Sequence, residues 1–210
     1  MAEARARPFP PLHVVTDDEV LARPGFARRA SAVLEAGGVR LALHLRGPST
    51  GGRALFEEAS GLAPAAHGCG AVLLVNDRVD VALAAGADGV QLGRRGMLPA
   101  DARRLVGAER LLGCSVSPGD ELPEEADFLL VGSVYATASH PGRAGSGAER
   151  LAETAGCGVP LVGIGGITPE RVAEVRGAGA AGVAALRGVW DAPDPAEAVA
   201  RYLEAWKDTR

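Results

Sequence analysis

Pro160-Leu-Val-Gly-Ile-Gly-Gly-Ile-Thr-Pro169 and Ala181-Gly-Val-Ala-Ala-Leu-Arg-Gly188 are the two segments that decide the fold of this chain. Each is a short apolar run that ends in glycine or other small residues and is followed by residues typical of a helix start. Strands of parallel α/β barrels end in this way where backbone N–H groups face a phosphate. The pair therefore indicates both a barrel and an anionic ligand.

Six further apolar runs precede this pair, and a longer segment with helical spacing follows each run. Residues that favour a helix start, such as Thr50, Asp77 and Thr168, open several of these segments. Eight β–α units predict an α/β protein with a single closed, parallel, eight-stranded (β/α)8 TIM barrel. We expect one domain over residues 1–210, with residues 1–11 as a disordered N-terminal tail. The expected strands are residues 12–16, 39–46, 71–75, 89–92, 110–115, 127–131, 160–163 and 181–184.

An open, doubly wound sheet is the main alternative to a barrel. A dinucleotide-binding sheet requires Gly-x-Gly-x-x-Gly after its first strand, because the glycines let the backbone approach a pyrophosphate. Here Thr16-Asp-Asp-Glu-Val20 follows the first expected strand. The sequence therefore favours the barrel.

Composition excludes several classes of function. The net charge is −4 and arginine is spread along the chain, which argues against nucleic acid as a partner. No apolar run approaches the roughly 18 residues that a bilayer span requires, so we expect a cytoplasmic protein without a membrane partner. The only lysine is Lys207, which excludes a Schiff-base aldolase with a lysine on an interior strand. Cys69, Cys114 and Cys157 are expected to be buried, reduced thiols, and a homodimer is left open.

Residues at the carboxyl ends of barrel strands carry the chemistry in this fold. Most of those expected here are polar, and they carry charges of both signs. They are Thr16, Asp17, His44, Arg46, Asn76, Asp77, Gln91, Ser115, Ser117, residues 133–147, Gly165, Gly166 and residues 186–188. Backbone N–H groups of Gly165, Gly166, Leu186 and Arg187 are expected to bind a phosphate.

His44 and Arg46 have the same phase in the second strand, because strand side chains alternate with period two. Arg46 is expected to clamp a phosphate or carboxylate through its planar fork, and a buried ion pair with a neighbour such as Asp17 is the alternative. His44 is interpreted either as a proton carrier or as a hydrogen-bonded core histidine.

Other candidates also have structural alternatives. Asp77 could cap the following helix or bind a metal ion, and Gln91 and Ser115 could recognise a ligand or fill the barrel. Residues 135–147 contain several glycines and few apolar anchors, which is typical of a mobile lid, although a solvated loop is the alternative. Within this segment the expected anion contacts are Thr137, Ser139, His140 and Arg143.

These residues together resemble the thiamine phosphate synthase and thiazole tautomerase superfamily over nearly the whole chain. The resemblance is carried by residues 14–17, 43–46, 75–93, 113–115, 132–137, 163–167 and 182–185. It implies a thiamine-biosynthesis enzyme whose partner is a phosphorylated small molecule, a thiazole phosphate held by the glycine segments. It also implies that Asn76, Asp77, Gln91, Ser115, Thr137, Ser139 and Arg143 bind substrate, and that His44, Arg46, Ser133 and His140 act in catalysis.

The synthase branch joins a hydroxymethylpyrimidine diphosphate to a thiazole phosphate and releases pyrophosphate with the help of Mg²⁺. This chain departs from the pattern of that branch at three positions. Pro48 and His140 stand where the branch has lysines, and Gly96 stands where it has a magnesium carboxylate. Asp77 is then the only metal ligand that the resemblance implies, so no metal site is assigned unless the chain is a synthase.

The tautomerase branch isomerises a thiazole phosphate carboxylate to its aromatic form. His44, Arg46 and the missing carboxylate resemble this branch, whereas Ser133 replaces its histidine in the sixth strand. A hydroxyl is a poor general base near neutral pH, so His44 or His140 would carry the proton. We therefore predict a tautomerase-like isomerase. The alternatives are a synthase, which is a transferase, and a non-catalytic ligand-binding or regulatory paralogue.

Overall fold

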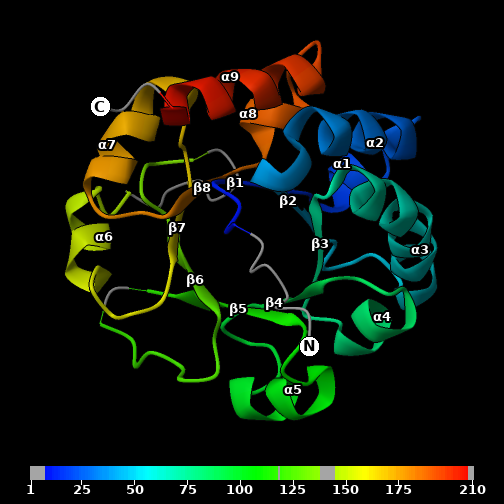
Figure 1. Ribbon diagram of the computed structural model, residues 1–210, viewed down its shortest axis with the longest axis horizontal. Coiled ribbons are helices and arrows are strands. Elements are labelled where there is room, and N and C mark those ends of the chain that lie inside the picture. Colours follow the sequence, from blue (N-terminus) through cyan, green and yellow to red (C-terminus); the bar gives the residue numbers. More distant parts are fainter. Residues whose placement is uncertain (1–7, 118, 138–144, 208–210) are drawn as a thin grey trace, which may run out of the picture.

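The computed structural model describes residues 8–117, 119–137 and 145–207. Its strands form one closed, parallel barrel in the order β1 to β8, with β8 paired to β1 (Figure 1). The strands are β1 (Leu12–Val15), β2 (Leu41–Leu45), β3 (Val72–Asn76), β4 (Gly89–Leu92), β5 (Leu111–Val116), β6 (Phe128–Gly132), β7 (Leu161–Ile164) and β8 (Gly182–Ala185). Every expected strand is present, and the predicted TIM barrel is confirmed.

Helices surround the barrel as an outer ring (Figure 1). They are α1 (Asp18–Leu21), α2 (Phe26–Gly37), η1 (Gly38–Arg40), α3 (Gly52–Cys69), α4 (Val79–Ala84), α5 (Pro99–Val106), α6 (Glu149–Thr154), η2 (Pro169–Arg171), α7 (Val172–Gly177), α8 (Arg187–Trp190) and α9 (Pro195–Lys207). Between β5 and β6 no helix occurs among the residues that the structure describes, so this part of the ring consists of loop.

Two separate apolar layers hold these elements together. The larger one packs the outward side chains of the strands against the helices and includes Leu43, Leu73 and Leu129. The smaller one fills the barrel itself with inward side chains such as Leu74, Phe128 and Val162. Because parallel strands are covered on both faces, their sequences are almost continuously apolar. The few polar residues inside the barrel therefore stand out as candidates for function.

The amino-terminal end of the barrel is closed by a segment that precedes β1. The ring of Phe9 lies 5.3 Å from that of His13 and 5.7 Å from that of Phe128, centroid to centroid. The carbonyl of Pro11 accepts a hydrogen bond from the N–H of Val183 in β8. Residues 9–11 are thus part of the packed structure, which differs from the expected disordered tail, whereas Pro8 is exposed and residues 1–7 lie outside the described residues.

All three cysteines are free thiols, as expected, but only Cys114 is buried, whereas Cys69 and Cys157 are partly exposed. None of the described helices is long and apolar enough to cross a lipid bilayer.

Candidate active site

The carboxyl ends of β7 and β8 lie side by side. The two strands pair up to Ile164 and Ala184, so Gly165 and Gly166 run on beside the end of β8. Gly165 has a φ of 103°, which side-chain-bearing residues rarely adopt. In the described structure, the N–H groups of Gly165 and Gly166 donate no hydrogen bond to another backbone group. N–H groups left available at a strand end are suited to bind an anion.

The first turn of α8 follows β8 directly and extends this edge. Leu186 precedes the helix, and the N–H groups of Arg187 and Gly188 likewise donate no backbone hydrogen bond within the described structure. The guanidinium of Arg187 is directed to carboxylates, with Nη2 3.1 Å from Glu19 and 3.5 Å from Asp17. The side chain of Arg187 is therefore engaged by carboxylates while its backbone N–H stays available, and phosphate binding at this position stays a prediction.

Arg171 is a cationic neighbour of this edge that the sequence analysis did not single out. Its Nη1 donates a hydrogen bond of 2.7 Å to the carbonyl of Gly166, and its guanidinium lies 4.3 Å from the ring centroid of Tyr135. The position of Arg171 in η2, five residues after Gly166, was the available signal. This side chain adds positive charge beside the glycine segment.

His44 and Gln91 are two of the buried polar residues inside the barrel, and neither side chain is accessible to solvent. His44 Nε2 lies 2.7 Å from His13 Nδ1. Burial lowers the pKa of His44 to about 3, although the side chain of Asn76 opposes that shift. A histidine with this pKa is neutral at physiological pH and is a weak base. The structure thus favours the hydrogen-bonded core histidine over the proton carrier.

Polar side chains on β3, β4 and β5 lie next to one another, beginning with Asn76. Asn76 is paired with Gln91 in the ladder, and the amide of Gln91 donates to Ser115 Oγ over 3.1 Å. A Cβ on Gly113 would overlap Gln91 Oε1, so glycine at this position makes room for the amide. The structure brings Asn76, Gln91 and Ser115 together, and their role in substrate binding stays a prediction.

Arg46 follows β2 and is positioned through its backbone. Its N–H donates to Thr16 Oγ1 over 2.8 Å, and that hydroxyl donates to the carbonyl of Arg46 over 2.9 Å. The suggested ion pair with Asp17 is not formed, because Asp17 accepts the N–H of Val20 and pairs with Arg187. Within the described residues the guanidinium of Arg46 has no ion pair, which leaves it available for an anionic ligand.

Asp77 lies between β3 and α4, but it does not cap that helix. Arg78 holds the cap position, and no side-chain hydrogen bond caps α4. The carboxylate of Asp77 instead accepts the N–H of Gly93 at 2.6 Å, and a Cβ on Gly96 would lie 2.8 Å from its Oδ1. The helix-cap prediction is wrong because the chain turns at Asp77 with a φ of 59°, which directs the carboxylate to the loop after β4.

Ser133 directly follows β6 and lies against the glycine segment. Its carbonyl accepts the N–H of Ser146 at 2.9 Å, and a Cβ on Gly165 would lie 2.7 Å from Ser133 Cβ. Thr137 is partly buried in the loop that follows. The expected contacts Ser139, His140 and Arg143 lie outside the described residues.

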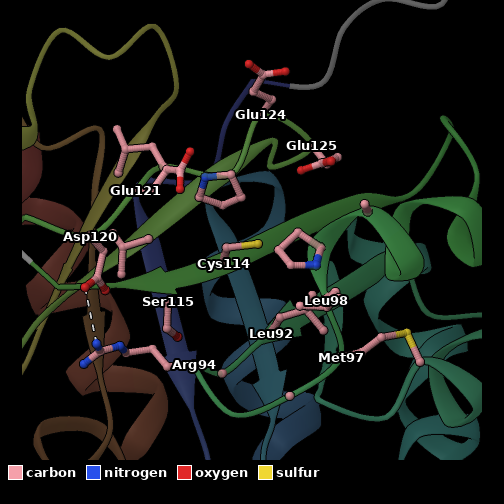
Figure 2. Close-up of a pocket in the computed structure, with 17 residues that line it drawn as sticks. Leu92, Arg94, Met97, Leu98, Cys114, Ser115, Asp120, Glu121, Glu124 and Glu125 are labelled. Atoms are coloured by element: carbon pink, nitrogen blue, oxygen red, sulfur yellow. Dashed lines mark hydrogen bonds and ion pairs between the residues drawn. The ribbon is translucent and has the colours of Figure 1, made fainter.

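A cavity of about 680 Å³ lies outside the barrel between α5 and the loop after β5 (Figure 2). Ser115 and Cys114 lie at its inner wall, and burial raises the pKa of the Cys114 thiol to about 11, so it is not a reactive thiolate. Arg94 pairs with Asp120, while the carboxylates of Glu121, Glu124 and Glu125 line the rim. This excess of negative charge disfavours a phosphate here and favours the end of β7 and β8.

Metal ligands are few at the site. Over residues 8–117, 119–137 and 145–207, no group of three or more His, Cys, Asp or Glu side chains is arranged to hold a metal ion. Asp77 provides a single carboxylate at the mouth. One carboxylate fits a magnesium ion only if substrate phosphate oxygens and water complete the octahedral shell.

Comparisons with known proteins bear on what this site does. The model of the family described as thiamine monophosphate synthase matches residues 12–189. The thiamine-phosphate synthase of Xanthobacter autotrophicus is 42% identical over 200 residues, covering 92% of this chain and 93% of that protein. The thiamine-phosphate synthase of Laribacter hongkongensis is 39% identical over 201 residues, covering 93% and 94%. The solved thiamine phosphate pyrophosphorylase of Pyrococcus furiosus superposes with a TM-score of 0.80 at 29% identity, covering 97% of this chain and 98% of that one.

Proposed function

Because the chain belongs to the thiamine monophosphate synthase family and is a thiamine-biosynthesis enzyme, we propose that it is a thiamine-phosphate synthase. It would join a hydroxymethylpyrimidine diphosphate to a thiazole phosphate and release pyrophosphate. The relatives are named as synthases, so they support this alternative better than the tautomerase-like isomerase that the sequence analysis placed first. The lowered pKa of His44 also weakens the isomerase interpretation, which relied on a proton carrier.

The names of the relatives carry the choice of a synthase, and the edge formed by the ends of β7 and β8 supports a phosphorylated substrate. Gly165, Gly166 and Arg187 bring available backbone N–H groups to adjacent strand ends, and Arg171 adds a cation beside them. This arrangement suits the phosphate of the thiazole substrate. Arg46 and the polar side chains of β3 to β5 are then available for the diphosphate substrate.

Arg46 and Asp77 are the groups that would meet the diphosphate. The guanidinium of Arg46 can bind two phosphate oxygens through its planar fork. Asp77 would hold Mg²⁺ together with the diphosphate oxygens, and the ion would neutralise negative charge on the leaving group. Asn76, Gln91 and Ser115 would orient the pyrimidine ring through hydrogen bonds.

The departures from the synthase pattern leave few charged groups at the proposed diphosphate site. Pro48 and Gly96 supply neither a cation nor a second carboxylate. Arg46 and an ion held by Asp77 would thus be the main groups that neutralise the negative charge of the leaving pyrophosphate. We therefore expect pyrophosphate release to depend steeply on Mg²⁺ concentration.

The test is an assay of the purified protein with both sets of substrates, with and without Mg²⁺. Magnesium-dependent release of pyrophosphate and formation of thiamine phosphate support the synthase. Metal-independent isomerisation of the thiazole phosphate carboxylate would support the tautomerase instead. Retained binding of thiazole phosphate with neither activity would support a regulatory paralogue. A cytoplasmic location, the absence of a nucleic acid or membrane partner, and a homodimer stay predictions.

A further inference from the structure

Two histidines form a hydrogen-bonded chain inside the barrel that the proposed reaction does not yet use. His13 Nε2 lies 3.1 Å from the carbonyl oxygen of Pro10, and His13 Nδ1 lies 2.7 Å from His44 Nε2. His13 is 1% exposed and His44 is fully buried. The chain therefore runs from the closed end of the barrel through β1 to β2, toward the mouth.

The positions of the hydrogen atoms in this chain follow from its first member. A carbonyl oxygen can only accept, so His13 Nε2 must carry the proton. Burial and the neighbouring His44 hold the pKa of His13 well below its usual value, and burial lowers that of His44 to about 3. Both rings are neutral, so His13 Nδ1 is an acceptor and His44 Nε2 carries the proton that it accepts. The remaining nitrogen, His44 Nδ1, is left with a lone pair.

His44 Nδ1 is buried and makes no well-formed hydrogen bond within the described residues, although the side chain of Asn76 is close enough to raise the pKa of His44. Two further buried acceptors on the next strands, Asn76 Oδ1 and Gln91 Oε1, also lack a donor there. A buried acceptor without a donor costs free energy unless a ligand or water supplies one. Three such acceptors on β2, β3 and β4 point to a ligand that brings N–H or O–H groups.

We propose that His13 is a positioning residue, which fixes His44 in the tautomer protonated at Nε2 and so keeps His44 Nδ1 as an acceptor for a donor group of the substrate. The identity of that substrate, the pyrimidine diphosphate, rests on the proposed function, whereas the tautomer does not. Ring packing supports the arrangement. The ring centroid of Phe128 lies 5.4 Å from that of His13 and 6.3 Å from that of His44, whose ring it meets edge-on. This packing restricts both imidazoles.

Without His13 the tautomer of His44 should reverse. The Nε2–H group would then lose its acceptor inside an apolar barrel, and leaving it unpaired is unfavourable. Protonation at Nδ1 instead would place a donor near Asn76 Oδ1, which lacks one in the described structure. The reversed tautomer would no longer accept a hydrogen bond from the substrate at Nδ1.

The test is long-range ¹H–¹⁵N spectroscopy of the histidine rings in the full-length protein. The chain has four histidines, and the signals of His44 are identified by their loss in His44→Gln. In the wild-type protein we expect His44 to be protonated at Nε2 and unprotonated at Nδ1. A wild-type His44 protonated at Nδ1 would overturn the proposal without any variant.

Two substitutions separate positioning from packing. His13→Asn keeps an acceptor oxygen near the place of Nδ1 and should retain the wild-type tautomer, whereas His13→Leu should reverse it. A His13→Leu protein that folds and keeps His44 protonated at Nε2 would overturn the proposal. If His13→Leu does not fold, the His13→Asn variant decides: a folded His13→Asn protein in which His44 is protonated at Nδ1 would overturn the proposal.

Kinetics provide a second readout if the synthase assay succeeds. In His13→Leu the KM for the pyrimidine diphosphate should rise between about twofold and tenfold, as for the loss of one neutral hydrogen bond. The KM for thiazole phosphate should stay unchanged, and His13→Asn should recover most of the loss. An unchanged KM for the pyrimidine diphosphate despite a reversed tautomer would overturn the link to the substrate. If no synthase activity is found, the proposed function fails while the tautomer measurement still decides the role of His13.

Discussion

Gly96 lies directly beside the carboxylate of Asp77, so that a Cβ at position 96 would be 2.8 Å from Asp77 Oδ1. The Cβ of any side chain introduced at position 96 would therefore be directed toward Asp77, the proposed metal ligand. The N–H of Gly93 already holds the same oxygen at 2.6 Å. A carboxylate introduced at position 96 would therefore lie next to that of Asp77.

Gly96→Asp should make the stability of the protein dependent on magnesium. Without the metal, a second carboxylate beside Asp77 adds charge repulsion and crowding, and we expect the Tm to fall by a few degrees, corresponding to about 1 kcal/mol. With millimolar Mg²⁺ the two carboxylates share the cation and the Tm recovers. Thermal unfolding at several Mg²⁺ concentrations measures this. Gly96→Asn is the matched uncharged control, and an equal response of both variants to Mg²⁺ would contradict the prediction.

The strands were predictable because both faces of each are covered, so that apolar runs mark them directly. Register between neighbours was not predictable, since it depends on the closure of the whole barrel. Val15 pairs with His44 in the ladder, and this places His13 and His44 within hydrogen-bond distance. The sequence indicated that His44 could lie in the core, but not that it forms a chain with His13 and Pro10.

The position of Gly165 and Gly166 at a strand end was predictable, because an apolar run followed by glycines marks the end of a barrel strand, and their phosphate role stays a prediction. It was less predictable where side-chain direction depends on loop conformation. Asp77 has a residue type typical of a helix cap, yet its positive φ turns the carboxylate toward Gly93. Arg171 lies in a short helical turn whose path back to Gly166 is set by tertiary packing. Neither outcome follows from local propensity.

Gly165→Ala should impair both stability and phosphate binding. The added methyl group would meet Ser133 at 2.7 Å, and alanine strongly disfavours the φ of 103°. We expect a loss of about 1–3 kcal/mol in the free energy of unfolding and a clear loss of affinity for thiazole phosphate. Urea unfolding and calorimetric titration measure the two effects. Gly61→Ala in α3 is the control, because nothing lies within 4 Å of its Cβ and it should stabilise the helix.

The buried histidines predict how stability depends on pH. Both have a pKa in the folded state below the usual 6.5, so the unfolded chain binds more protons as the pH falls below that value. Their stabilising contribution is complete above about pH 6.5 and is lost progressively toward the folded-state pKa, which is about 3 for His44. Each should contribute a slope of about 1 kcal/mol per pH unit in this range. Unfolding curves of His13→Asn between pH 4 and 7 should show a shallower slope, and a slope equal to that of the wild type would contradict the neutral pair.

Arg46 tests whether the diphosphate binds opposite the glycine edge. Its backbone is fixed by Thr16, whereas its guanidinium has no ion pair within the described residues, so Arg46→Ala should leave the Tm nearly unchanged. The same substitution should raise the KM for the pyrimidine diphosphate by roughly tenfold or more, because a bidentate, charge-assisted contact is lost. Arg46→Lys keeps the charge but not the planar fork, and should recover only part of the affinity. Steady-state assays that vary each substrate in turn measure the effect. A rise in the KM for thiazole phosphate alone would place the thiazole phosphate group, and not the diphosphate, against Arg46.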